Sequence, residues 1–285
     1  MKRSDFRCLD RLRVRWAEVD LQKIVFNGHY LMYFDTAVAS YWRALALPYH
    51  DAMALLGGDL YVRKATLEYE GSAHYDEQLA VGVRCARIGN SSMRFAAAVF
   101  RGEQRLVHGE LVYVFADPAT QTSQPLPPAL RAVLEGYEAG QAMVAVQAGR
   151  WDAMATEVRA LREAAFVAEQ GLPATLVEDA ADAQALQLVL RNRLGMVVAC
   201  GRLLEPGQGV ARVGRIATLA AVRGAGLGQA LLDALVAAAA ARGDRELRLT
   251  ALAGAASFYE RAGWRRLGAE VFEDGRPHVP MGRAV

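Results

Sequence analysis

Residues 222–228 read VRGAGLG, and they stand between a predicted strand at residues 211–219 and a strongly helical run at residues 229–241. Alternating apolar residues indicate the strand, and Gly243 ends the helical run. Glycines between a strand and a helix let successive backbone N–H groups converge on an anion, and the helix N-terminus adds a favourable field. The stretch therefore predicts a phosphate-binding loop.

The spacing of the glycines narrows the class of loop. Dinucleotide-binding folds carry GxGxxG and Walker loops end in GK[ST], and neither pattern is present in this stretch. The pattern RxxGxG instead resembles the acetyl-CoA pyrophosphate loop of GNAT acyltransferases. This resemblance implies acetyl-CoA as a substrate, with the pyrophosphate on main-chain donors of the loop and the pantetheine along the preceding strand. The residues that it assigns to CoA binding are Ile216, Ala217 and Leu219 in the strand and Arg223, Gly224, Ala225, Gly226, Leu227 and Gly228 in the loop.

Other stretches resemble the same family, in the same order along the chain. Together with the loop they span about residues 143–283, and a further strand is predicted at residues 246–251. The SFYERAGW stretch resembles the family's FYExxGF helix, and the others resemble segments of one branch of the family. They are LR at 161–162, FVAEQGLP at 166–173, SFYERAGW at 257–264 and EDGRPHVPM at 273–281.

Tyr259 aligns with the residue that protonates the leaving thiolate in many GNAT enzymes. A phenol with an unperturbed pKa near ~10 can serve as such an acid. The alternative is a core tyrosine whose hydroxyl is hydrogen-bonded within the fold. The base that deprotonates an amine is not evident; Glu169 and His278 are candidates through their motifs, although each is expected to be structural.

The first half of the chain has a different pattern. A helix with apolar residues on nearly all sides is predicted from Asn27 to about Leu45, and such a helix is expected to be enclosed. Asn27 is its expected N-cap. Tight turns are expected at Gly89 and Gly102. This order indicates an antiparallel sheet wrapped around a central helix, which is the hotdog fold. The predicted strands are residues 11–16, 60–69, 78–88, 91–100 and 105–116.

Residues 19–31, VDLQKIVFNGHYL, resemble 4-hydroxybenzoyl-CoA-thioesterase-like hotdog enzymes, and the likeness extends over about residues 8–135. The resemblance implies hydrolysis of acyl-CoA thioesters in a homodimer or homotetramer formed through this domain. It places Asp20 on the catalytic carboxylate, which attacks the thioester or activates water. The N–H groups around Asn27 and Gly28 would polarise the thioester carbonyl.

Alternatives stay open around these residues. Asp20 could be a loop carboxylate that accepts from nearby backbone N–H groups. An Asp20/His29 pair would suit a dehydratase, but a helix histidine in apolar surroundings is more often a core residue. Glu18 is expected to be solvated. The sequence departs from the family at Lys23, where glycine is usual, and at Asn27, where several relatives carry histidine.

Composition limits the remaining possibilities. The 285 residues are 53% hydrophobic with a net charge of +2, and neither half is polarised enough to suggest binding to nucleic acid or a membrane surface. Cys8, Cys85 and Cys200 lie far apart, which supports neither a disulfide framework nor a metal site. No signal peptide or spanning segment is expected, so the protein is expected to be cytoplasmic.

A proline-punctuated stretch at residues 117–128 precedes a short predicted helix at residues 129–137. The predicted organisation is an α+β chain, with a hotdog domain at residues 1–138 and a GNAT domain with a mixed sheet at residues 139–285. The predicted function is a bifunctional enzyme that hydrolyses acyl-CoA thioesters and transfers an acyl group from CoA to an unidentified amine. The alternative is a CoA-binding sensor or scaffold in which one domain, more readily the hotdog, is inactive.

Overall fold

The computed structural model describes residues 1–273 and 275–285. Contacts divide the chain into two compact units, Met1–Met143 and Val144–Val285. This division falls a few residues beyond the predicted one at 138/139. Asp274, part of the C-terminal stretch that resembles the GNAT branch, lies outside the described residues.

The first unit is built on an antiparallel sheet in the order β1-β3-β4-β5-β2. Alternating polar and apolar residues form the strands, and the glycine-containing turns at Gly89 and Gly102 connect the meander as predicted. The first strand begins and ends earlier than residues 11–16, and Trp16 instead starts a short 3-10 turn, Trp16–Glu18. The strands are β1, Cys8–Arg13; β2, Asp59–Tyr69; β3, Gln78–Ile88; β4, Ser92–Arg101; and β5, Gln104–Ala116.

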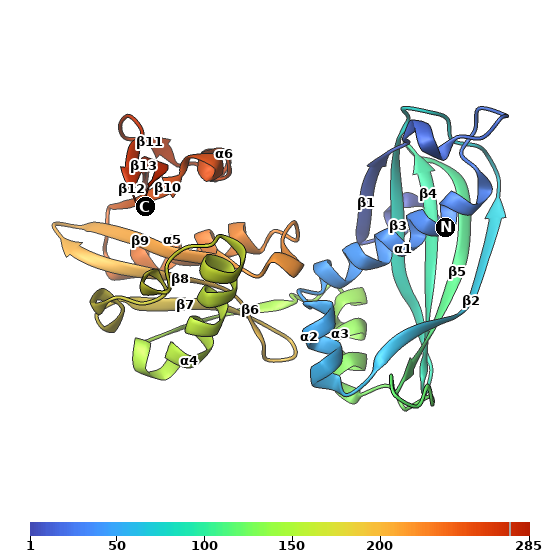
Figure 1. Cartoon of the computed structure of the whole chain (residues 1–285), viewed down its shortest axis with the longest axis horizontal. Helices are drawn as coiled ribbons and strands as arrows, with labels where there is room; N and C mark the ends of the chain where they lie inside the picture. Colours follow the sequence, from blue (N-terminus) through green and yellow to red (C-terminus); the bar gives the residue numbers. More distant parts are fainter. Residues whose placement is uncertain (274) are drawn as a thin grey trace. The chain divides into compact units, whose positions relative to one another are not determined.

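Helix α1, Asn27–Ala44, packs against this sheet, and Figure 1 shows it lying across the strands. Its buried side chains recur at helical spacing, but the side that carries Met32, Asp35 and Thr36 is exposed. The prediction that the helix is enclosed on all sides is therefore wrong for the single chain. Helices α2, Tyr49–Leu56, and α3, Pro128–Glu138, complete the unit. The buried side chains of α1 are Tyr30, Tyr33, Phe34, Ala37, Val38, Tyr41 and Trp42.

The second unit is built on a mixed sheet in the order β11-β13-β10-β9-β8-β7-β6, with β12 paired to β13. Strands β9 and β10 are parallel, and the other pairs are antiparallel. The architecture confirms the predicted hotdog unit followed by a unit with a mixed sheet. Its strands are β6, Val144–Gly149; β7, Leu186–Asn192; β8, Val197–Gly207; β9, Val210–Thr218; β10, Glu246–Leu252; β11, Arg265–Arg266; β12, Val271–Glu273; and β13, Arg276–Ala284.

Helices cover both faces of this second sheet. Cys200 of β8 belongs to a buried cluster with α4, Trp151–Arg162. A side chain at the next residue, Gly201, would instead meet Leu231 and Leu235 of α5, Leu227–Arg242. Because neighbouring strand residues point to opposite faces, α4 and α5 lie on opposite sides of the sheet. The short helix α6, Ala256–Arg261, follows β10.

Candidate functional site

Asp20 lies in a tight loop that leads to α1. Its backbone N–H donates to the Ile24 carbonyl oxygen at 2.9 Å, and its own carbonyl accepts from the Lys23 N–H at 2.9 Å. Among the described residues, the half-buried carboxylate accepts one hydrogen bond, from the Gln22 N–H at 2.8 Å. The loop therefore fixes the carboxylate while leaving acceptor positions on it open. Both the catalytic interpretation and the local-capping interpretation are compatible with this contact.

Lys23 adopts a φ of 63°, in the left-handed region that favours glycine. This explains the glycine expected at this position in the thioesterases that the stretch resembles. The lysine side chain is exposed. The lysine therefore replaces the usual glycine without a change in loop conformation, at a cost in backbone strain.

The N-terminus of α1 lies next to this loop. A bridge between Val19 and Val25 places Asp20 opposite Ile24, shortly before the start of the helix, and the Phe26 N–H donates to the Glu18 carbonyl. The N-cap is Phe26, without a side-chain cap, so the expectation that Asn27 is the N-cap is wrong by one residue. Asn27 and Gly28 are the first helical residues and are exposed, and among the described residues their N–H groups have no backbone acceptor. These N–H groups can donate to a thioester oxygen.

Glu18 is buried, at 3% exposure, so the expectation that it is solvated is wrong. Its carboxylate accepts from the Tyr33 hydroxyl at 2.7 Å and from the Arg15 N–H at 2.8 Å. Burial disfavours the charged carboxylate, but the hydrogen bonds from Arg15 and Tyr33 outweigh it and lower the pKa of Glu18. Glu18 therefore fastens the start of the loop to α1 as an anion.

His29 is directed to a different neighbour. Its ring packs edge to face against Phe26, with centroids 5.9 Å apart. Within the described part of the chain no interaction joins His29 to Asp20. The structure thus does not form the Asp/His pair that a dehydratase interpretation needs.

In the second unit, the predicted loop precedes α5. Gly224 and Gly226 have φ values of 85° and 80°, and a side chain at either would project into open space. Gly226 is the N-cap and the helix begins at Leu227, two residues earlier than predicted. The Arg223 N–H donates to the Ala220 carbonyl, so the free donors begin after it. Among the described residues, the N–H groups of positions 224–229 have no backbone acceptor.

Gly228 has a different role from the two loop glycines. A Cβ atom at this position would lie 3.1 Å from the ring of Phe258 in α6. The glycine therefore allows α6 to approach the N-terminus of α5. Tyr259, which follows Phe258, is brought to the same end of α5.

The strand before the loop offers a free edge. Strand β10 pairs with β9 only from Val210 to Arg212, and the two strands separate beyond that point. On its other side, β9 continues to pair with β8 through Ala217 and Thr218. Between these regions Arg215 takes a φ of 52° beside a register shift. Ile216 and Ala217 therefore lie on a strand whose β10-facing edge is open to an extended ligand.

Arg223 of the loop pairs with Glu169 of the upstream motif, and its guanidinium also donates to the Thr218 carbonyl at 3.0 Å. The hydrogen bond from Arg223 lowers the pKa of Glu169, which makes this carboxylate a weak base. His278 places its Nδ1 2.9 Å from the Arg276 carbonyl oxygen. Both candidates for the amine base are thus engaged within the fold.

The Tyr259 ring is buried, with 9% of the residue exposed, against Phe258 and Trp264. Burial raises the pKa of its hydroxyl to about 12. In the part of the chain that is described, no hydrogen bond of this hydroxyl is found. The raised pKa keeps the hydroxyl protonated in the neutral range, as a proton donor must be.

Sequence reasoning missed a buried ionic network behind β9. Arg162 and Asp182 have no exposed surface and pair at 3.0 Å. Arg202 bridges from Asp182 to Asp179, and Asp179 also accepts from Arg215 at 2.8 Å. The network thereby anchors Arg215 beside the register shift of β9. Arg162 belongs to the LR stretch that resembles the GNAT branch. The network could not be predicted, because its residues come from four separate segments and form no local sequence pattern.

Two further observations concern metals and membranes. Among the described residues, no group of three or more His, Cys, Asp or Glu side chains is placed to hold a metal ion. None of the described helices combines the length and apolar character that crossing a bilayer requires. Cys8, Cys85 and Cys200 are buried free thiols.

The chain matches two family models. The Thioesterase superfamily matches residues 22–108, beginning two residues after Asp20. The Acetyltransferase (GNAT) domain matches residues 152–284.

Individual proteins resemble one or the other part. An uncharacterized N-acetyltransferase of Bacillus subtilis is 34% identical over 122 residues, which are 42% of this chain and 86% of that protein. An Aquifex aeolicus protein provisionally named an esterase is 29% identical over 91 residues, 32% of this chain and 70% of that protein. A crystal structure of a provisionally named N-acetyltransferase from Lactobacillus plantarum is 31% identical, covers 50% of this chain and 99% of its own, and has a TM-score of 0.48. The chain therefore belongs to the GNAT acetyltransferases through its C-terminal part, and its N-terminal part matches the Thioesterase superfamily model over residues 22–108.

Proposed function

We propose that the protein is a bifunctional enzyme of CoA thioesters, hydrolysing them in the hotdog domain and transferring an acyl group from CoA to an amine in the GNAT domain. The observation that carries the proposal is the run of free N–H groups at positions 224–229, where two left-handed glycines lead into α5. Such a run at the positive end of a helix suits a pyrophosphate. The membership of both domains in families that act on CoA thioesters supports a common substrate class.

In the GNAT domain, the proposed assignments follow the geometry of β9 and α5. Main-chain donors from Gly224 to Gly228 hold the pyrophosphate, and the pantetheine lies along the free edge at Ile216, Ala217 and Leu219. Tyr259 gives its proton to the leaving thiolate. Because the pKa of Tyr259 is raised, the phenol keeps its proton across the neutral range and is available as a proton donor.

In the hotdog domain, we propose that Asp20 attacks the thioester or activates water, and that the N–H groups of Asn27 and Gly28 stabilise the oxyanion. Preorganised donors at a helix N-terminus suit a negative charge that develops during the reaction. The supporting contacts are the loop hydrogen bonds of Asp20 and the free N–H groups at the start of α1.

A second copy of the chain is proposed to complete the hotdog site, as a homodimer or homotetramer. Beside Asp20, Leu21 and Trp16 are highly exposed, and Phe26 is 51% exposed. Strand β2 is an edge strand with mostly exposed side chains, including Val62. A partner would cover this apolar surface and exclude water from the thioester. Light scattering at micromolar concentration would test it, and a monomer with full hydrolytic activity would contradict it.

The proposed pyrophosphate cradle, formed by the main-chain donors from Gly224 to Gly228, is tested by ligand-induced stabilisation. Acetyl-CoA at about 100 times its Kd should stabilise the GNAT domain by about 2.7 kcal/mol and raise its Tm. Gly226→Glu should abolish the shift, because bulk and negative charge would occupy the pyrophosphate position. Gly243→Glu is the matched control: Gly243 caps the other end of α5 with a φ of 90°, so its substitution strains the backbone equally but spares the cradle. An equal shift in both variants would refute the assignment.

Hydrolysis is tested separately in the Gly226→Glu background, in which the GNAT domain should not use CoA. Free thiol released from a panel of aliphatic and aromatic acyl-CoA thioesters should persist in this variant. Absence of thiol release from every member of the panel would refute the thioesterase assignment without affecting the acyltransferase assignment.

A further inference from the structure

A pocket of about 530 Å³ opens on the hotdog sheet, outside the proposed catalytic loop. It lies on the face of the sheet that does not contact α1. Phe95 of β4 packs on Tyr41 of α1, whereas Phe100, five residues further and therefore on the other face, packs on Phe6. Residues of β1 and β3 form its floor, because Arg11 lies opposite Ala80 and Arg13 opposite Gln78 in the register.

The lining of the pocket is strongly basic. Arg3, Arg11 and Arg13 contribute to it, and the lining contains no acidic side chain. Arg13 is held by Asp76 at 2.9 Å. Arg3 pairs with Glu103 at 2.8 Å, but the Glu103 side chain is 78% exposed, so this pair is weak and can be exchanged. Arg11 makes no ion pair with any described residue.

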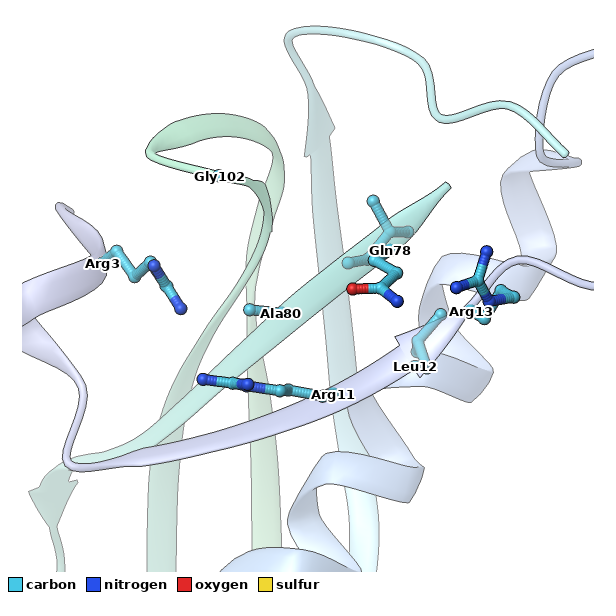
Figure 2. A pocket seen from close by; sticks show the side chains of 8 residues that line it. Arg3, Arg11, Leu12, Arg13, Gln78, Ala80 and Gly102 are labelled. Carbon is cyan, nitrogen blue, oxygen red and sulfur yellow. The ribbon is translucent and has the colours of Figure 1, made fainter. Parts of the chain in front are cut away.

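Two of these cations point at each other. Figure 2 shows the guanidinium groups of Arg3 and Arg11 converging beside Ala80, with the Gln78 amide on the same floor. The Nε atom of Arg3 is buried and has no hydrogen-bond partner among the described residues. Like charges that converge on a hollow, with a donor left unused, are stabilised when an anion lies between them.

The wall that carries Arg3 is fixed in place. Phe6 packs edge to face on Phe100 at 5.8 Å, and Gly82 leaves room for the Phe6 ring, since a Cβ there would lie 2.4 Å from it. The Arg105 guanidinium donates to the Met1 carbonyl at 2.9 Å. The N-terminal segment is therefore packed onto the sheet, and the pocket is a preorganised feature of the domain.

We propose that this pocket binds the phosphate group of a small molecule, between Arg3 and Arg11 with Gln78 as a further donor. Guanidinium forks match phosphate oxygens in a bidentate manner, and the two groups approach from different elements, Arg3 from a 3-10 turn and Arg11 from strand β1. The phosphate comes either from a free phosphorylated metabolite or from the 3′-phosphate of CoA. The second source rests on the proposed use of CoA thioesters by this domain, whereas the first does not.

The test is a titration of the full chain with inorganic phosphate at constant ionic strength, followed by calorimetry. All proteins carry Gly226→Glu, so that the loop before α5 contributes nothing. Arg11→Gln should weaken phosphate binding at least about tenfold, the loss expected for a charged hydrogen-bonding group. Arg3→Gln should have a similar effect. Arg87→Gln is the control, because Arg87 is an exposed arginine of strand β3, which also carries Gln78, and does not line the pocket.

The outcomes separate a site from general attraction. Loss of binding in Arg11→Gln and Arg3→Gln with retention in Arg87→Gln supports the pocket. Equal weakening in all three variants, or no saturable binding by the Gly226→Glu chain, overturns it. A parallel titration compares CoA with 3′-dephospho-CoA. A preference for CoA that disappears in Arg11→Gln identifies its 3′-phosphate as the source, and phosphate binding without such a preference identifies a free phosphorylated ligand. Neither result depends on thioester hydrolysis.

Discussion

Each unit of the chain places a loop before a helix, and the two loops are built differently. The loop before α5 uses left-handed glycines, Gly224 and Gly226, and its N–H groups find no backbone acceptor among the described residues. The loop before α1 puts Lys23 in the left-handed region and adds an acidic side chain, Asp20. One loop therefore presents main-chain donors alone, and the other combines donors with a carboxylate. Donors suffice to hold an anion, whereas hydrolysis also needs a base or nucleophile.

The surroundings of the loops differ as well. The α5 loop is supported by its own unit, since Phe258 packs against Gly228. The α1 loop exposes Leu21 completely and half of Phe26. Burial of the first site is thus supplied within the chain, while the second has apolar surface that a partner would cover.

The largest expected effect concerns the buried ions that stabilise only the GNAT unit. Asp182→Asn leaves the fully buried Arg162 guanidinium without its main counter-charge and should destabilise this unit by roughly 3–5 kcal/mol. Glu246→Gln, the same change in the exposed pair with Arg248, should leave the Tm nearly unchanged. Calorimetry should show the lower Tm in one unit only, and an unshifted Tm would mean that the buried pair does not contribute.

The same carboxylates set the sign of the pH dependence. Hydrogen bonds from Arg202 hold the pKa of Asp179 well below its usual value of 3.8. A lowered folded-state pKa contributes stability above the unfolded pKa that is lost as the pH falls. The GNAT unit should therefore lose stability below about pH 4, and Asp179→Asn should flatten this dependence in acid-unfolding curves. An acid limb that stays unchanged in the variant would contradict the assignment.

Asp20→Asn tests the chemical difference between the loops. The amide keeps an acceptor for the Gln22 N–H, so the loop should persist while hydrolysis of acyl-CoA falls about 10³-fold. Asp117→Asn is the control, because Asp117 also accepts hydrogen bonds from loop N–H groups, those of Ala119 and Thr120. The Asp117→Asn protein should hydrolyse acyl-CoA at the normal rate. Undiminished thiol release by Asp20→Asn would reduce this residue to a local cap.

Tyr259→Phe tests whether the site at the α5 loop needs a side-chain acid in addition to its main-chain donors. The kcat for acetylation of the best amine in a panel should fall about 10²-fold. Stabilisation by acetyl-CoA should be retained, because the cradle is made by main-chain groups. With a pKa of about 12, the tyrosine of the parent protein should stay active well above pH 9. A normal kcat in the variant would assign Tyr259 to packing.

The smallest effect is expected from exchanging the residues at the left-handed positions. Lys23→Gly should stabilise the hotdog unit by up to about 1 kcal/mol, since it relieves a strained φ. Gly226→Ala should have the opposite sign in the GNAT unit, because alanine must adopt a φ of 80° there. Thermal unfolding measures the change in Tm of each variant. A Tm lowered by Lys23→Gly would show that the lysine side chain makes a stabilising contact.

The sequence alone determined what local patterns can carry. The alternation and turn residues predicted β3 to its ends, and the glycine loop with its flanking strand and helix predicted the start of α5 within two residues. These features are encoded by neighbours in the chain, because periodicity and backbone preference act over a few residues. The predicted N-cap of α1, Asn27, lies one residue after the observed one, Phe26, because the cap position also depends on the path of the incoming chain.

Only the tertiary structure decided which residues meet across the chain. The burial of Glu18 depends on Tyr33, the engagement of Glu169 on Arg223, and the burial of Tyr259 on Phe258 and Trp264. The basic pocket likewise joins Arg3, Arg11 and Gln78 from separate segments. Burial and charge pairing are properties of residues brought together from distant positions, so no window of the sequence contains them.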